Sequence, residues 1–325
     1  MARSGITHDP LRAAAPVATP APAGGRFPPS RALVAVLSAL AGFMLTVVWS
    51  AEFVDRTIGG SVAGSLLGHP ALETPITGVV AGTVFAFVSG LAGTFTACNV
   101  AVFGALAPML GGAGGRRRRL LLALRPLGWL AAGMLTVSAC YGAVVGFVGT
   151  RMPQFSTTQN AAGGLSARTI QSMVIFGLIG LSMTYFGLAA LGIVPDPFDR
   201  ISRRFPQARV VFMGALVGGF LIGRPFPLFR HLFRDAAESG NPLYGALAFA
   251  LQSVGNIAVM ALLFLILVYF AGGRLHRWLT ATPYRLAVVT AALLIVAGVF
   301  TFLYWDVRLL AGRGVIPWYP TAPWA

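Results

Sequence analysis

Long apolar runs alternate with short arginine-bearing segments along most of this 325-residue chain. About 20 consecutive apolar residues are enough for a helix to cross a bilayer. The pattern therefore predicts an all-α, polytopic membrane helix bundle. We expect seven spans, near residues 32–50, 76–110, 120–149, 168–193, 208–229, 242–271 and 283–311.

The two ends of the chain differ from the spans. Residues 1–30 are rich in Ala, Pro and Gly, which predicts a disordered cytoplasmic tail. Residues 31–53 hold an apolar run too long for the core of a signal peptide, so we expect an extra N-terminal transmembrane helix. Residues 312–325 form an aromatic and Pro-rich tail, which is typical of a membrane–water interface.

Composition points to the bilayer as a partner. The chain is 56% hydrophobic and only 10% charged, whereas soluble domains carry roughly 25% charged residues. A net charge of +15 could indicate nucleic acid. The arginines fall between the apolar runs, however, where they set membrane topology. We therefore expect no nucleic-acid partner.

Arginine placement predicts the orientation. Arginine-rich segments (the N-terminal tail, 111–125, 194–209 and 272–285) alternate with the sparser loops 51–75 and 150–167. Because basic loops stay cytoplasmic, we expect the N-terminus inside and the C-terminus outside. The connection 230–241 falls on the outer side although it holds Arg230 and Arg234, which Asp235 and Glu238 offset.

Two of the apolar runs contain features that interrupt a helix. Ser89–Leu110 combines glycines and Pro108 with Thr96, Cys98 and Asn99. The run after 208 is glycine-rich and reaches GRPFPLF at 223–229. Broken helices occur in membranes where they are buried in protein or line a cavity. We expect both interruptions to line one cavity.

The interruptions recur at matching places in the chain. Residues 76–193 and 208–311 each comprise one broken span followed by two further spans. An odd number of spans per copy forces the two copies into opposite orientations. The pattern predicts a six-span inverted repeat (3+3), with its site where the broken helices meet.

The order of features over 76–311 resembles the transmembrane family of CcdA and DsbD, the cytochrome c biogenesis and thiol-reductant conduits of bacterial membranes. The residues that carry the resemblance are Ala97-Cys98, the loop RRRRLLLALRPLGWLAAG, Pro225-Phe226-Pro227 and the segment AAESGNPLYGALAFALQSVGN at 236–256. It implies a multi-pass protein of the bacterial inner membrane with Cys98 as redox thiol. It also implies transfer of reducing equivalents from cytoplasmic thioredoxin to an extracytoplasmic thiol protein.

Two positions differ from the family pattern. Ala97 stands where the family has a proline, and Phe226 stands where it has a second cysteine. Thiol exchange needs one thiol to attack and a second to resolve the mixed disulfide. Phe226 therefore favours two alternatives, a permease for a small solute or soft metal, and a non-catalytic membrane scaffold.

The candidate cavity residues are polar or lie at the interruptions. Gln252 and Asn256 are one helical turn apart and share a face, either to bond a neighbouring helix or to line the cavity. An arginine near a span end snorkels to the interface or contacts an anion. The full set is Thr96, Asn99, Arg224, Pro225, Phe226, Gln252 and Asn256, with Cys98 as the candidate redox thiol.

Other chemistry has little support. Cys98 and Cys140 both lie in apolar spans outside any CxxC motif, and the four histidines are scattered, so we expect no metal site and no cofactor. Cys140 lies in TVSACYGAVVG, where small residues predict close helix packing. Asp196 and Asp199 in PDPFD are interpreted as turn formers.

Overall fold

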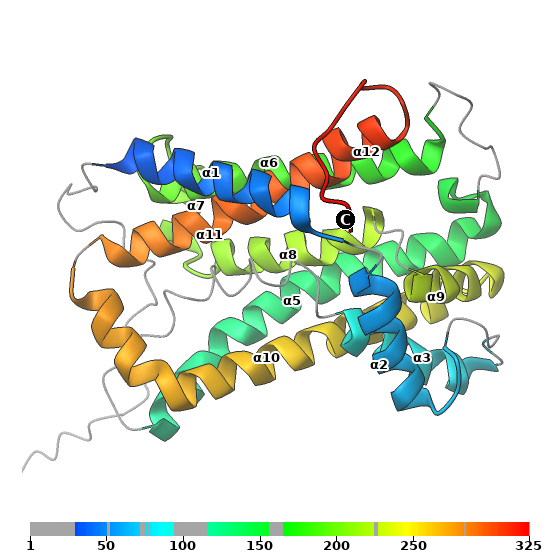
Figure 1. Ribbon diagram of the computed structural model, residues 1–325. Helices are drawn as coiled ribbons and strands as arrows, with labels where there is room; N and C mark the ends of the chain where they lie inside the picture. The colour runs from blue at the N-terminus through cyan, green and yellow to red at the C-terminus, as the bar shows by residue number, and fades with distance from the viewer. Residues whose placement is uncertain are drawn as a thin grey trace, which may run out of the picture.

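The computed structural model describes residues 30–50, 53–71, 76, 78–93, 116–155, 165–223, 227–282 and 284–324. All regular elements among these residues are helical, which confirms the predicted all-α class. The main helices run in the order α1 (Arg31–Val48), α2 (Gly60–Leu67), α3 (Gly78–Ala92), α5 (Arg116–Val148), α6 (Ala167–Ala190), α7 (Asp199–Arg204), α8 (Ala208–Gly223), α9 (Pro227–Glu238), α10 (Pro242–Thr280), α11 (Arg285–Phe302) and α12 (Arg308–Gly312) (Figure 1). Short π-helical segments cover Phe53–Gly59 and Leu303–Val307, and short 3-10 turns cover Gly149–Arg151 and Pro153–Phe155.

Five helices of the described chain are long and apolar enough to cross a membrane, and a bent pair of helices can form a sixth span. The five are α1, α5, α6, α10 and the continuous stretch Arg285–Gly312; the bent pair is α8 and α9. The remaining predicted span, 76–110, is the second in chain order. The structure describes it only over α3. Its 15 residues rise about 22 Å, which is less than the roughly 30 Å of a bilayer core.

The surface of this bundle is apolar and part of its interior is polar. Phe147 is 81% exposed, and Phe270 and Val80 are each 78% exposed, whereas Ser138 and Ser253 are fully buried. A soluble protein rarely leaves so much apolar surface uncovered. Lipid chains cover such a surface at no cost, so the distribution fits a helix bundle embedded in a bilayer.

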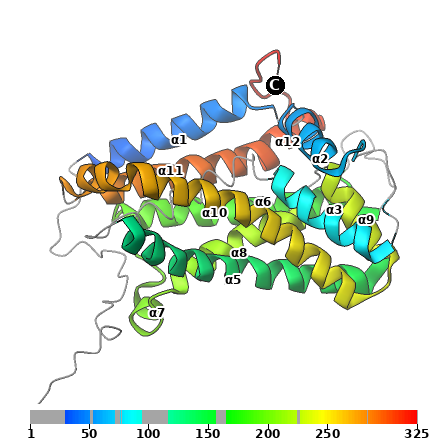
Figure 2. The same ribbon diagram turned by 90° about the horizontal axis from the view of Figure 1, so that it is seen from below.

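The main helices pack against one another in a few large pairwise contacts. The centre is the contact between α5 and α10. Helix α8 packs on α5, while α3 packs on α10, and α6 packs on α11. Helix α1 lies at the edge and contacts mainly α11, as Figures 1 and 2 both show. Helix α1 is therefore peripheral in the described bundle.

Glycines bring the two central helices together. A Cβ added at Gly142 of α5 would lie 2.7 Å from the carbonyl carbon of Gly245 in α10, and a Cβ at Gly245 would overlap the carbonyl oxygen of Gly142. The two backbones are thus in direct contact, as small residues permit in membrane helix pairs.

Several predicted loops are helical. Residues 227–238 form α9, an amphipathic helix that buries Leu228, Leu232 and Phe233 and exposes Arg230 and Arg234. The arginine run that begins at 116 starts α5, and α10 continues through the predicted loop to Thr280. The charged residues predicted loops at these places. Arginine side chains extend readily from helix ends into the interface, so charge does not end a helix there.

The predicted turn at PDPFD is confirmed. Asp196 Oδ1 accepts a hydrogen bond of 2.9 Å from the backbone N–H of Phe198, which closes an Asx turn. Asp196 also pairs with Arg209, and Asp199 pairs with Arg203 at 3.0 Å. These two carboxylates therefore organise the link between α6 and α8.

A buried serine pair joins the central helices. Ser253 Oγ donates to Ser138 Oγ at 2.6 Å, and Ser138 Oγ donates to the carbonyl of Met134 at 2.9 Å. We expect Ser253→Ala to destabilise the protein in detergent by about 0.6 kcal/mol, the average for such bonds in membranes. A double-mutant cycle with Ser138→Ala measures the coupling. The control is Thr136→Ala, whose hydroxyl bonds only within α5. Additive single effects would contradict the prediction.

Candidate functional site

The bundle is interrupted between α8 and α9. Helix α8 ends at Gly223 and α9 begins at Pro227, with an angle of 82° between them. This bend agrees with the predicted interruption of the second broken span. The predicted residues Arg224, Pro225 and Phe226 lie outside the described residues, so their roles stay predictions.

Side chains from the α5–α6 connection and from α6 satisfy the last carbonyls of α8. The Ile222 carbonyl accepts hydrogen bonds from Gln171 Nε2 at 3.0 Å and from Gln154 Nε2 at 3.3 Å. The Gly223 carbonyl accepts from Ser172 Oγ at 2.6 Å. Carbonyls at a helix end have no partner in their own helix, and in an apolar surrounding each needs one. These side chains therefore stabilise the interruption.

Tyr141 of α5 completes this network. Its hydroxyl oxygen accepts from Gln154 Nε2 at 2.6 Å and from Gln171 Nε2 at 3.2 Å. Its ring lies against Phe249 of α10, with centroids 5.6 Å apart. The Gln154 Oε1 atom is buried and has no hydrogen-bond partner among the described residues.

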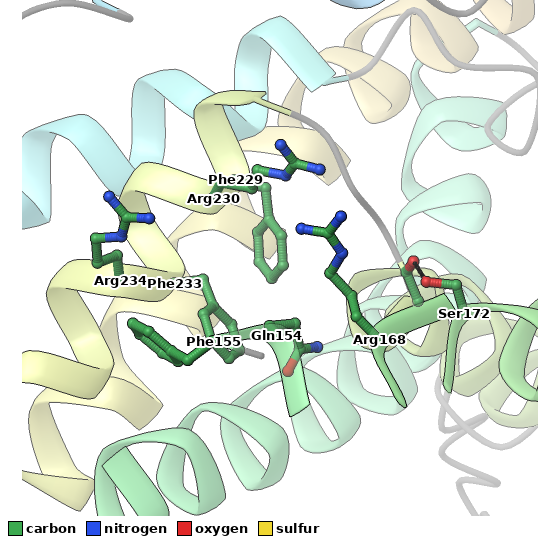
Figure 3. A pocket seen from close by; sticks show the side chains of 9 residues that line it. Gln154, Phe155, Arg168, Ser172, Phe229, Arg230, Phe233 and Arg234 are labelled. Atoms are coloured by element: carbon green, nitrogen blue, oxygen red, sulfur yellow. Dashed lines mark hydrogen bonds between the residues drawn. The ribbon is translucent and has the colours of Figure 1, made fainter. Parts of the chain in front are cut away.

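A pocket opens beside the interruption, with a volume of about 100 Å³. We call it the arginine pocket. Figure 3 shows side chains from α6, α9 and the α5–α6 connection around it, with Arg168 and Arg230 near the ring of Phe229 and the guanidinium of Arg234 apart from them. It is lined by Gln154, Phe155, Arg168, Ser172, Gly223, Phe229, Arg230, Phe233 and Arg234.

Helix α9 holds two of these arginines in place. Its buried side packs Phe229 and Phe233 against Phe249 of α10, with centroids 5.2 and 6.3 Å apart. Asp235 accepts a short hydrogen bond from the hydroxyl of Tyr244, which also ties α9 to α10. The opposite side of α9 is left to Arg230 and Arg234.

Gln252 and Asn256 lie at a different place, where α10 packs on α3. A Cβ at Gly90 of α3 would lie 2.9 Å from the backbone nitrogen of Asn256. Gln252 is 3% exposed, and its Oε1 has no partner among the described residues. The predicted shared face is thus directed at α3. Neither residue lines the arginine pocket.

The helix that they contact leads toward the cysteine-bearing segment. Helix α3 ends at Ala92, shortly before the predicted site residues Thr96, Cys98 and Asn99. Those three residues lie outside the described part of the chain. Their placement in a cavity therefore stays a prediction.

Cys140 is exposed on the outer side of α5, and the prediction of close packing at this residue is wrong. The close packing that TVSACYGAVVG predicts is made by Gly142 and Gly146 against α10. The described residues contain no group of three or more His, Cys, Asp and Glu side chains placed to hold a metal ion.

Sequence reasoning missed most of the arginine pocket. Arg230 and Arg234 stood out only as a charge imbalance in a predicted outer loop, and Arg168, Gln154 and Gln171 were not singled out. An available signal was the helical spacing of Leu228, Leu232 and Phe233 opposite the two arginines.

The fold defines a multi-pass α-helical membrane protein. No family model, no curated protein and no solved structure matches the chain. The resemblance to the CcdA and DsbD family remains a prediction from sequence.

Proposed function

We propose that the protein is a small-solute permease of the bacterial inner membrane and that the solute passes the interruption between α8 and α9. The observation that carries this proposal is the arginine pocket beside a broken span. Interrupted helices at membrane depth are typical of transporters, whose sites form where helix ends meet a cavity.

The proposal includes the inverted 3+3 repeat. In the repeat, α3 corresponds to α8, α5 to α10, and α6 to α11. Exchanging each helix for its counterpart converts the α3–α10 contact into the α5–α8 contact. The same exchange leaves the α5–α10 and α6–α11 contacts unchanged. This reciprocity supports two related halves of opposite direction. In this architecture 76–110 is a further span, and the sequence match between FTACN at 95–99 and GRPFPLF at 223–229 stays a prediction.

The proposed orientation places the N-terminus inside and the C-terminus outside. Arg31 at the start of α1 donates to the carbonyl of Gly192 just after α6, so these two ends share one side of the bundle. Arg200, Arg203 and Arg204 lie on α7, which follows on the same side (Figure 1). A side this rich in arginine is typical of the cytoplasm.

Solute flux into proteoliposomes tests the permease. The test protein carries Cys98→Ser, Cys140→Ser and a single new thiol, Phe155→Cys, in the lining of the pocket, which leaves all three pocket arginines in place. We expect this protein to transport at least one small solute, and a bulky neutral thiol reagent to lower its initial rate at least tenfold by filling the pocket. Arg313→Cys, which is exposed outside the pocket, is the matched control. Equal rates with and without modification at residue 155 would exclude this path.

A thiol-reductant conduit is the second candidate, and the reciprocal packing supports it as well, because the resemblance implies two facing halves. In such a conduit the thioredoxin dithiol is oxidised, and its two electrons pass by thiol–disulfide exchange to an extracytoplasmic disulfide. Trapping with thioredoxin in intact membranes tests it. A mixed disulfide lost in Cys98→Ser but kept in Cys140→Ser would support the conduit. Transport that survives removal of both cysteines would instead favour the permease.

A further inference from the structure

The arginine pocket concentrates positive charge. Of the nine described residues that line it, three are arginines and none is acidic. Arg168 is half-buried on α6, and Arg230 and Arg234 are exposed on α9. Figure 3 shows the side chains of Arg168 and Arg230 extending to the opening beside the ring of Phe229. Like charges at this density repel one another, so the pocket has a strong positive potential.

Two of the three pocket arginines are not neutralised within the described part of the chain. Arg168 and Arg234 make no ion pair or hydrogen bond with any part of the chain that the structure describes. Arg230 and Arg234 are four residues apart on one helix, a spacing at which like charges destabilise the helix. An anion in the pocket would relieve the repulsion.

Helix polarity adds to the effect. Arg168 lies in the first turn of α6, which contains no acidic residue, and Arg230 lies at the fourth position of α9. A helix N-terminus carries partial positive charge, so an arginine there is unfavourable unless an anion is close. Two helix ends of this kind border the same pocket.

We propose that the arginine pocket binds a phosphate-type oxyanion. Guanidinium groups match such oxygens with paired N–H donors. The volume of about 100 Å³ equals that of about three water molecules, which is room for a tetrahedral oxyanion. Ser172 also lines the pocket, but its hydroxyl already donates to the Gly223 carbonyl, so the arginines are the donors for the oxyanion.

The oxyanion has two sources, free phosphate from the aqueous side or the headgroup of an anionic lipid. Both contain the same chemistry, and the phenylalanines Phe155, Phe229 and Phe233 lining the pocket could also contact an attached apolar chain. This inference rests on the pocket of the proposed permease and names the class of solute that it admits.

Binding to the full-length protein in nanodiscs separates the two sources. One arm titrates inorganic phosphate, with sulfate and chloride at matched ionic strength, into discs of phosphatidylcholine alone. The other arm measures by native mass spectrometry which lipid stays bound after exposure to mixtures with phosphatidic acid. The variants are Arg168→Gln and Arg234→Gln, and Arg313→Gln is the control outside the pocket. Because Arg234 is exposed on α9, its variant keeps the test valid even where Arg168→Gln fails to fold.

We expect phosphate to bind, and each pocket variant to weaken its binding at least tenfold while the control has no effect. Retention of phosphatidic acid that is lost in the same variants would assign the site to a lipid headgroup. The inference is overturned by absence of both ligands, or by equal losses in Arg313→Gln. Phosphate binding without phosphate flux would leave this inference intact and remove the permease. Phosphate flux that persists in Arg168→Gln and Arg234→Gln would support the permease and overturn this inference.

Discussion

Replacing Gly142 by leucine is expected to abolish the folded bundle, whereas the same replacement at Gly128 is expected to be tolerated. Both glycines lie in α5. A Cβ at Gly142 would lie 2.7 Å from the carbonyl carbon of Gly245 and 2.9 Å from the Cβ of Phe249, but a Cβ at Gly128 would meet nothing within 4 Å. The matched pair therefore separates steric overlap from the general effect of removing a glycine.

The expected loss is large because backbone faces backbone. Overpacking in ordinary cores costs about 1–3 kcal/mol, since side chains move aside. Here two long helices would have to separate along the central α5–α10 contact, so we expect more than about 3 kcal/mol. Leucine also favours a helix over glycine by nearly 1 kcal/mol, so Gly128→Leu should be neutral or stabilising.

Size-exclusion chromatography in mild detergent measures the result. We expect the monodisperse fraction of Gly142→Leu to fall at least tenfold below that of Gly128→Leu. Gly245→Leu should reproduce the loss from the other helix. Similar profiles for the three variants would show that α5 and α10 do not approach as closely as described.

The spans were predictable from sequence, but their partners were not. A single run of about 20 apolar residues can satisfy its backbone hydrogen bonds in a bilayer only as a helix. Helices α1, α6 and α10 therefore follow from composition. Which helix Gly142 contacts depends on Gly245, about 100 residues away, and nothing local to either glycine specifies the pairing. The two helices meet only when the halves assemble.

Cys140 illustrates the limit of a local pattern. The small residues around it correctly predicted close packing by this part of α5. Residues 140 and 142 are separated by about 200° around a helix, so one packs on α10 while the other is exposed. Choosing the buried face required the inward pair Tyr141 and Val145, which the sequence reading did not use.

The arginine pocket could not be predicted because its parts are distant in sequence. Gln154 and Gln171 are 68 and 51 residues before the carbonyl that both of them bond. In isolation each is a polar residue near a span end, which is ordinary at an interface. Only the bend after Gly223 brings that carbonyl to them and gives both glutamines a function.

The C-terminal tail is bound to the end of α1, where the sequence predicted an aromatic interface segment. The backbone N–H of Ala322 donates to the Val47 carbonyl at 2.9 Å, and Trp324 Nε1 donates to the Val48 carbonyl at 3.3 Å. The hydroxyls of Tyr319 and Thr46 are 2.6 Å apart. Carbonyls that would otherwise lack a partner at this helix end are satisfied from the far end of the chain.

Arg308 also donates hydrogen bonds to carbonyls at the end of α1, and together with the tail it caps this helix. Its Nη1 donates to the carbonyls of Thr46 at 2.6 Å and Trp49 at 2.9 Å, and its guanidinium lies 4.8 Å from the centre of the Tyr304 ring. Helix α1 contacts mainly α11 elsewhere in the bundle. The arginine and the C-terminal tail therefore both hold the end of this peripheral helix.

Replacing Arg308 by methionine is expected to lower the free energy of unfolding by about 2–4 kcal/mol, because two carbonyls lose a charged donor at once. Lysine, which offers a single ammonium group, should retain part of the stability. Thermal unfolding in detergent measures the loss, and limited proteolysis after Trp49 reports whether α1 detaches. Arg313→Met, exposed one turn later, should change neither. If Arg308→Met unfolds like Arg313→Met and stays resistant to cleavage, the cap does not hold α1 in place.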